Sequence, residues 1–281
     1  MADRNGVLPK QPLFYVLASV RVQPWMALPS KISDIQDTLR DRFPLLNQIV
    51  MEQFSQQPGF GNIPFGHGQP SPTAQPSAWA FHTADRTIGC QISMDQIVVH
   101  ALTYSRFSEF AETIRFVLST VEKYARHFDA SAIGIRYLDK IAPDEGEQLS
   151  NYLPDAFLPK ELKAPGFEAV GGMNQTIYKT KDGVLHARFW TGNGYAEVPD
   201  DLIPLYVLTQ DLSRQGAPVL KTLNPGHGTL DSDSIWTSQQ SVRMDTNAVI
   251  ETLQKLHSHA NGFFRSVCSN HAFEIWGKES L

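Results

Sequence analysis

The side chains best suited to chemistry lie in one short stretch, SAIGIRYLDKIAP at residues 131–143, whose pattern is that of a strand. Alternation in a strand places Tyr137 and Asp139 on one face and Arg136 and Lys140 on the other. On a functional interpretation, Arg136 and Lys140 bind an anion, and Tyr137 and Asp139 position it. On a structural interpretation, the same side chains satisfy buried partners or pair with carboxylates across strands. Because the two sets face opposite ways, one site cannot use all of them.

Histidines elsewhere offer acid–base chemistry. In an enzyme that acts on a small phosphorylated or nucleotide-like ligand, His82 or His100 would transfer a proton beside the strip at residue 136. No nucleophile elbow, Walker loop, dinucleotide fingerprint or Cys/His metal set accompanies them. His257 and His259 are two residues apart on an expected helix, whereas zinc-binding helices place their histidines at i and i+4. We therefore nominate no catalytic residue, no metal ligand and no cofactor.

Two Gly- and Pro-rich segments supply candidates for partner contacts. Residues 55–77 show no periodicity, and residues 213–240 are also expected to be irregular. Both contain a Gly-His-Gly triplet, and the first contains two aromatic residues without an expected core role. Because exposed aromatic side chains often dominate interfaces, the segments predict contacts with a protein partner or a second copy of the chain. The candidates are Phe60, Phe65, His67 and His227.

Composition narrows the class of protein. The net charge of −5 and pI near 6.0 argue against a strongly basic nucleic-acid binder. The two cysteines, Cys90 and Cys268, are too few for a disulfide scaffold and suit a reducing compartment. The first 25 residues show neither the pattern of a signal peptide nor that of a transmembrane span. We expect a cytoplasmic protein that binds no membrane.

Periodicity predicts the elements that position these side chains. Strands are expected over residues 13–23, 47–54, 78–83, 88–93, 96–105, 131–143, 168–180, 184–191 and 204–212. Helices are expected over residues 31–43, 107–128 and 247–267. The pair Asp182-Gly183 favours a tight hairpin between two of the strands.

These elements indicate an α+β fold, mostly antiparallel sheet, with two long amphipathic helices packed on one face. Residues 1–130 and 131–281 both begin with a strand and end near a long helix, so a structural duplication is a hypothesis. We expect the two halves to pack together as one globular unit.

The motif Arg-Tyr-Leu-Asp-Lys-Ile at residues 136–141 resembles the landmark strand of a sporadically distributed bacterial and archaeal family of unknown function. Three further stretches resemble that family in order, and the last departs from its usual Thr-x-Glu form. They are IQDTLRDRFP (35–44), WAFHTADRTIGCQISMDQIVVHALTYSRFSEF (79–110) and LHSHANGFFRSVCSNHAFEIWG (256–277).

The resemblance covers nearly the whole chain and implies no reaction. Patchy occurrence of the family is similar to that of accessory genes on mobile elements, such as defence or toxin–antitoxin modules. It implies a bacterial accessory protein that acts through protein–protein contacts. The alternative from the residues is an enzyme or binder for a small anionic or nucleotide-like ligand on the Arg136/Lys140 strip. Nucleic-acid binding on the sheet face is the third hypothesis, and the acidic pI argues against it.

Overall fold

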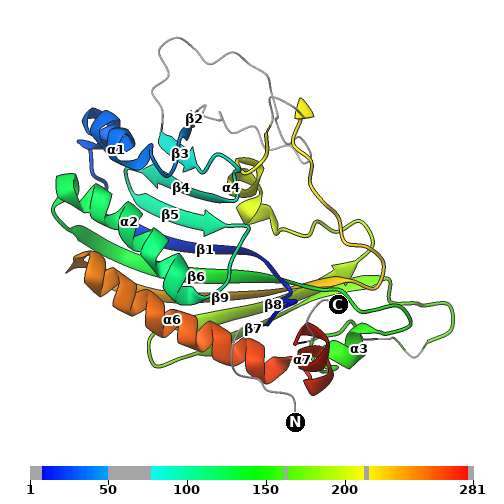
Figure 1. Cartoon of the computed structure of the whole chain (residues 1–281). Coiled ribbons are helices and arrows are strands. Elements are labelled where there is room, and N and C mark those ends of the chain that lie inside the picture. Colours follow the sequence, from blue (N-terminus) through cyan, green and yellow to red (C-terminus); the bar gives the residue numbers. More distant parts are fainter. Residues whose placement is uncertain (1–7, 50–76, 161, 163, 212–214, 278–281) are drawn as a thin grey trace, which may run out of the picture.

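The computed structural model describes residues 8–49, 77–160, 162, 164–211 and 215–277. Its centre is a nine-stranded antiparallel sheet with the strand order β2-β3-β4-β5-β1-β6-β9-β8-β7 (Figure 1). The strands are β1 (Leu13–Val22), β2 (Leu45–Ile49), β3 (Ala78–His82), β4 (Ile88–Ser93), β5 (Gln96–Ala101), β6 (Phe128–Ile141), β7 (Gly171–Lys179), β8 (Val184–Gly192) and β9 (Gly228–Met244). The predicted α+β class with an antiparallel sheet is confirmed.

Two long helices follow the two meanders of the sheet. They are α2 (Phe107–Ala125) and α6 (Thr246–Val267), which lie side by side in Figure 1 and contact each other. The shorter helices are η1 (Leu28–Ser30), α1 (Ile32–Leu39), α3 (Leu149–Tyr152), η2 (Asp200–Leu202), α4 (Ile203–Val207) and α7 (Asn270–Trp276).

The strand connections repeat about the central pair of β1 and β6. In the first half, β1 pairs with β5, the last strand of the meander β3-β4-β5, and α2 follows. In the second half, β6 pairs with β9, the last strand of the meander β7-β8-β9, and α6 follows. One sheet therefore spans both expected halves, and the predicted boundary between residues 130 and 131 falls inside β6.

Alternation along the strands divides the buried side chains between two faces of the sheet. On the helix side, Val16 of β1 and Ile135 of β6 join apolar side chains of α1, α2 and α6 in the largest cluster. On the opposite side, Leu17 and Leu138 join Tyr206 of α4 and other residues in a smaller cluster. A third cluster lies under α3 and α7. On the side opposite α2 and α6, the described helices cover less of the sheet, so its side chains have more access to solvent.

Local signals fix several element ends. The Asp245 carboxylate accepts a hydrogen bond of 2.8 Å from the Ala248 N–H and so caps α6. The hairpin predicted at Asp182-Gly183 joins β7 to β8. Gly183 has a φ of 153°, and a Cβ at this position would lie 2.1 Å from the Ile235 carbonyl oxygen. Only glycine fits so close to the neighbouring backbone.

Two sequence predictions are wrong. The strand expected over residues 204–212 is wrong, since this stretch begins in the helix α4 and continues as a turn; Pro204 favours a helix start, and short apolar runs do not distinguish helix from strand. The segment 213–240, expected to be irregular, contains the first thirteen residues of β9 (228 to 240). The polar run Asp231-Ser232-Asp233-Ser234 hides this strand, because the Asp231 carboxylate is buried against arginines of the flanking strands.

Candidate functional site

The strand β6 presents its polar side chains on both faces of the sheet, as alternation predicts. Tyr137 lies on the helix side with Ile133 and Ile135, and Asp139 follows it on the same face. Arg136 lies on the other side, directly opposite Leu17 of β1 and Asp233 of β9. Each face has its own cavity, and the two cavities differ in chemistry.

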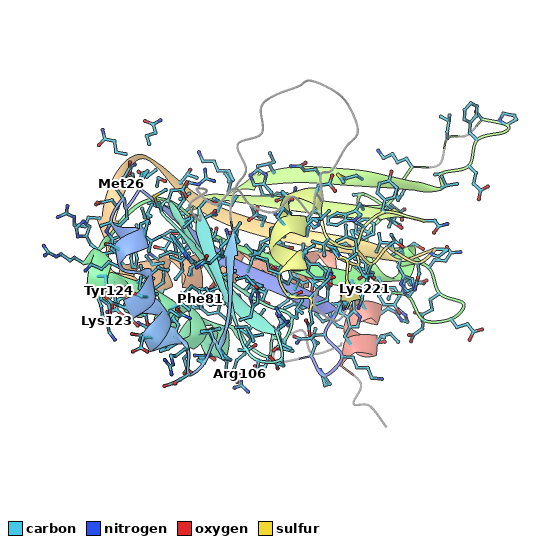
Figure 2. The ribbon with its side chains drawn as sticks, turned by 90° about the horizontal axis from the view of Figure 1, so that it is seen from above. Met26, Phe81, Arg106, Lys123, Tyr124 and Lys221 are labelled. Atoms are coloured by element: carbon cyan, nitrogen blue, oxygen red, sulfur yellow. The ribbon has the colours of Figure 1, made fainter. Side chains whose placement is uncertain are left out.

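On the helix side, a cavity of about 280 Å³ lies among β6, β9, α6 and the segments that precede β1 and α2. We call it the helix-side cavity. Its walls are largely apolar, and its polar side chains converge from β6, β9, α6 and the segment before α2. The lining includes Leu13, Tyr104, Phe107, Tyr137, Asp139, Ser232, His257 and Ala260. Arg106, at the margin of the molecule in Figure 2, is exposed and also lines the cavity.

A chain of hydrogen bonds crosses this cavity. The Tyr137 hydroxyl lies 2.7 Å from His257 Nδ1 and is also hydrogen-bonded to Tyr104. The His257 ring stacks on Phe107, with centroids 4.5 Å apart and an interplanar angle of 9°. Burial, followed by the charge of Arg265, lowers the pKa of His257 to about 4. Burial also raises the pKa of Tyr104 to about 12, so the chain is uncharged at neutral pH.

Two further polar groups in the cavity have no bonding partner among the described residues. The Asp139 side chain is buried, and no hydrogen bond or ion pair joins its carboxyl to the described part of the chain. Burial, reinforced by the negative charge of Asp231, raises the pKa of Asp139 to about 8. The Ser232 hydroxyl, opposite Tyr137 on β9, is buried and lacks a partner among the described residues. Buried polar groups are normally hydrogen-bonded, so both invite a ligand or water.

On the opposite face, the predicted anion-binding residues are already paired. Arg136 Nε and Nη2 each donate a 2.8 Å hydrogen bond to Asp231, and Nη1 contacts Asp201 at 2.5 Å. Arg188 Nη2 reaches the same Asp231 at 2.8 Å, and Lys140 pairs with Glu197. Burial disfavours the charge of Arg136, but the carboxylates outweigh it and raise its pKa.

A groove of about 560 Å³ lies beside this ion network, and we call it the polar groove. It lies between the sheet and the segment η2–α4. Its lining includes Ser19, Arg21, Gln91, Gln96, Asp201 and Asp233. Burial raises the pKa of Asp233 to about 6, although the charge of Arg136 opposes the shift. An external anion would have to displace a carboxylate from Arg136.

His82 and His100 occupy neither cavity. Both are fully buried, and their rings meet edge to face at 5.3 Å over Gly89, where a Cβ would lie 2.4 Å from the His82 ring. None of their four ring nitrogens has a partner among the described residues. Burial lowers the pKa of His82 to about 4, and burial with the His82 charge lowers that of His100 to about 3.

The partner-contact candidates are only partly described. Phe60, Phe65 and His67 lie outside the described residues. His227 is half-buried before β9, where its carbonyl accepts a 2.5 Å hydrogen bond from the Thr191 hydroxyl. The pKa of His227 is lowered, mainly because its ring is partly buried.

The helix-side cavity uses residues that the sequence did not single out. Ser232 comes from a segment without a motif, Tyr104 lies in the family-like stretch 79–110 without an assigned role, and His257 was considered as a zinc ligand and rejected. The signal for His257 was its place beside the apolar stripe of α6. No local signal marks Ser232, since only the register of β9 against β6 brings it opposite Tyr137.

The fold and site define an α+β protein whose single antiparallel sheet separates an apolar cavity from a polar groove. A search of protein-family models finds no match to the chain, and a search of curated proteins finds none. In the described part of the chain, no group of three or more His, Cys, Asp or Glu residues could hold a metal ion. No helix described here has the length and apolar character needed to cross a membrane.

Proposed function

We propose that the protein binds a small organic molecule in the helix-side cavity, with an apolar body and a hydrogen-bond-donating head group such as an amine. The observation that carries the proposal is a buried carboxyl, Asp139, and a buried hydroxyl, Ser232, that line this cavity and have no hydrogen-bond partner in the described part of the chain. Pockets that bind small molecules combine apolar walls with a few convergent polar groups.

The chemistry of the head group follows from the acceptors. An ionised Asp139 accepts hydrogen bonds only, and the Ser232 oxygen accepts as well. An amine placed between them would satisfy both, and its positive charge would compensate the buried carboxylate. The apolar body would contact Leu13, Phe107 and Ala260.

The helix-side cavity is a better ligand site than the polar groove. In the groove, Arg136 is held by Asp231 and Asp201, so its charge already has partners. A ligand in the groove can bind Arg136 only by breaking one of these ion pairs. In the helix-side cavity, by contrast, Asp139 and Ser232 have no partner among the described residues, so a ligand gains hydrogen bonds there without breaking an ion pair.

Three probes with the same ring and different head groups test the proposal: benzylamine, benzyl alcohol and benzoate. Titration calorimetry of the full chain should show benzylamine binding in roughly the millimolar range or tighter, as expected for a fragment of this size. Above about pH 8 benzoate should not bind, because the ionised Asp139 carboxylate repels its negative charge. The affinity for benzylamine should rise up to about tenfold per unit from about pH 6 to about pH 8, as Asp139 loses its proton.

Variants localise the binding. Ala260→Leu adds bulk to the cavity wall and should abolish benzylamine binding, whereas Gln96→Leu in the polar groove should leave it unchanged. No binding of the amine and the alcohol would overturn the proposed site. Benzoate that binds as tightly as benzylamine would overturn the proposed head group.

A second candidate is a bacterial accessory protein, located in the cytoplasm and acting through protein contacts, as the family resemblance implies. Exposed apolar side chains near and along the outer strand β7 favour it, notably Phe167, Val170 and Met173. The two cysteines are free and buried, in line with a reducing compartment. A co-purified protein from the native host, in stoichiometric amount, would support this candidate.

A further inference from the structure

The strand β7 forms one edge of the sheet. It pairs with β8 on one side, and no described residue forms a backbone hydrogen bond to its other side. It is nine residues long, whereas β2 at the opposite edge has five. An exposed strand of this length is a template for pairing with another strand.

Proteins usually block such edges with proline, bulges or inward-pointing charges. The sequence GGMNQTIYK of β7 has no proline, and its only charge is the final Lys179. Its register with β8 runs from Gly171 to Lys179 without a bulge. Met173 and Ile177 are 62% and 57% exposed, which is costly for large apolar side chains in a monomer.

The strand is also complementary to itself. If two copies pair antiparallel about a two-fold axis through Gln175, Met173 of each lies opposite Ile177 of the other. The same register places Asn174 opposite Thr176 and Gly172 opposite Tyr178. Each pair therefore joins compatible side chains: apolar with apolar, polar with polar, and glycine with an aromatic ring. The two members of each pair lie on the same face of the sheet.

Neighbouring registers lose this match. An axis through Asn174 places Met173 opposite Gln175, and an axis through Thr176 places it opposite Lys179. Met173 and Ile177 project to the side of the sheet that also carries Trp190. The other side of β7 is covered by the segment near Ala156, whose carbonyl accepts a hydrogen bond from Asn174.

We propose that two copies of the chain pair through β7 and form one continuous sheet across a two-fold axis at Gln175. The interface is isologous, so each copy supplies the same strand and the assembly closes as a dimer. Main-chain hydrogen bonds would hold the pair, and the two Met173–Ile177 contacts would set its register.

Sedimentation equilibrium of the full chain tests the pairing. The chain should dimerise, and Met173→Glu or Ile177→Lys alone should weaken dimerisation roughly tenfold or more, because each affects both symmetric contacts. The double variant places a glutamate opposite a lysine at both contacts and should recover most of the loss. Met26→Lys is the matched control, since Met26, labelled in Figure 2, is 74% exposed and lies outside β7, in the segment between β1 and η1.

A cross-link tests the register independently. Gln175→Cys should give a disulfide-linked dimer under mild oxidation, because residues directly opposite in a strand pair fit disulfide geometry. Lys179→Cys, at the strand end, should not. A wild-type chain that stays monomeric at roughly 100 µM, well above the Kd of a stable dimer, would overturn the proposal. So would a dimer unaffected by both single variants, or a double variant weaker than either.

Discussion

The two faces of β6 carry similar numbers of polar side chains, but they differ in whether those side chains have bonding partners. On the groove side, Arg136, Arg188, Asp231 and Asp201 satisfy one another in a network of ion pairs. On the cavity side, Asp139 and Ser232 are buried and find no partner among the residues that the structure describes, beside an uncharged Tyr–Tyr–His chain. Charge density alone is therefore a poor guide to a site. Buried groups that lack partners are better candidates than charges that have them.

The largest expected effect is on the groove side. Asp231 is fully buried and accepts hydrogen bonds from two arginines, so Asp231→Asn leaves both with too little compensating charge. Loss of one partner of a buried ion pair destabilises a protein by about 3–5 kcal/mol. Urea denaturation should show this loss in the free energy of unfolding. Asp201→Asn, at a largely exposed carboxylate, is the control and should cost far less.

The cavity side should respond to pH in a way that the ion network does not. The pKa of Asp139 is about 8 in the folded protein and about 3.9 in an unfolded chain. The folded state therefore binds the extra proton, and stability falls as pH rises from about 4 to about 8. Asp139→Asn cannot ionise and should gain on the wild type as pH rises, reaching about 4 kcal/mol at about pH 7. Parallel stability curves for the two proteins would contradict the proposed protonation of Asp139.

The histidine pair should give the smallest of these effects, with the opposite sign. The pKa of His100 is about 3 in the folded protein, below its ordinary value of about 6.5. Below about pH 6.5 His100 is protonated in the unfolded chain and stays neutral in the folded chain, so stability falls as pH falls. His100→Phe should reduce this acid sensitivity by about 2 kcal/mol at about pH 5. Acid-unfolding curves followed by circular dichroism would measure the difference, and an unchanged midpoint would contradict it.

Much of the fold can be predicted from the sequence, because its strands and helices follow local periodicity. Alternation in residues 133–141 gave the correct split of Arg136 from Tyr137, and the apolar stripe of α6 gave that helix. The strand β9 was missed because its polar residues are buried by partners on β6 and β8. The pairing of Tyr137 with His257 joins positions 120 residues apart, and no local pattern encodes such a contact. Family membership, the role of residues 55–77 and a true duplication remain predictions.

The place of β1 between β5 and β6 has a consequence for how the chain folds. The first strand made must pair with residues 96–101 and 130–139, so its hydrogen bonds close loops of roughly 80 to 120 residues. Contacts of such long range slow folding, because loop closure precedes the gain from pairing. During synthesis the meander β3-β4-β5 can capture β1 first, while the other edge of β1 stays open until β6 is made. A nascent chain paused near residue 125 would thus present an apolar strand edge, the stage at which it is most prone to aggregate.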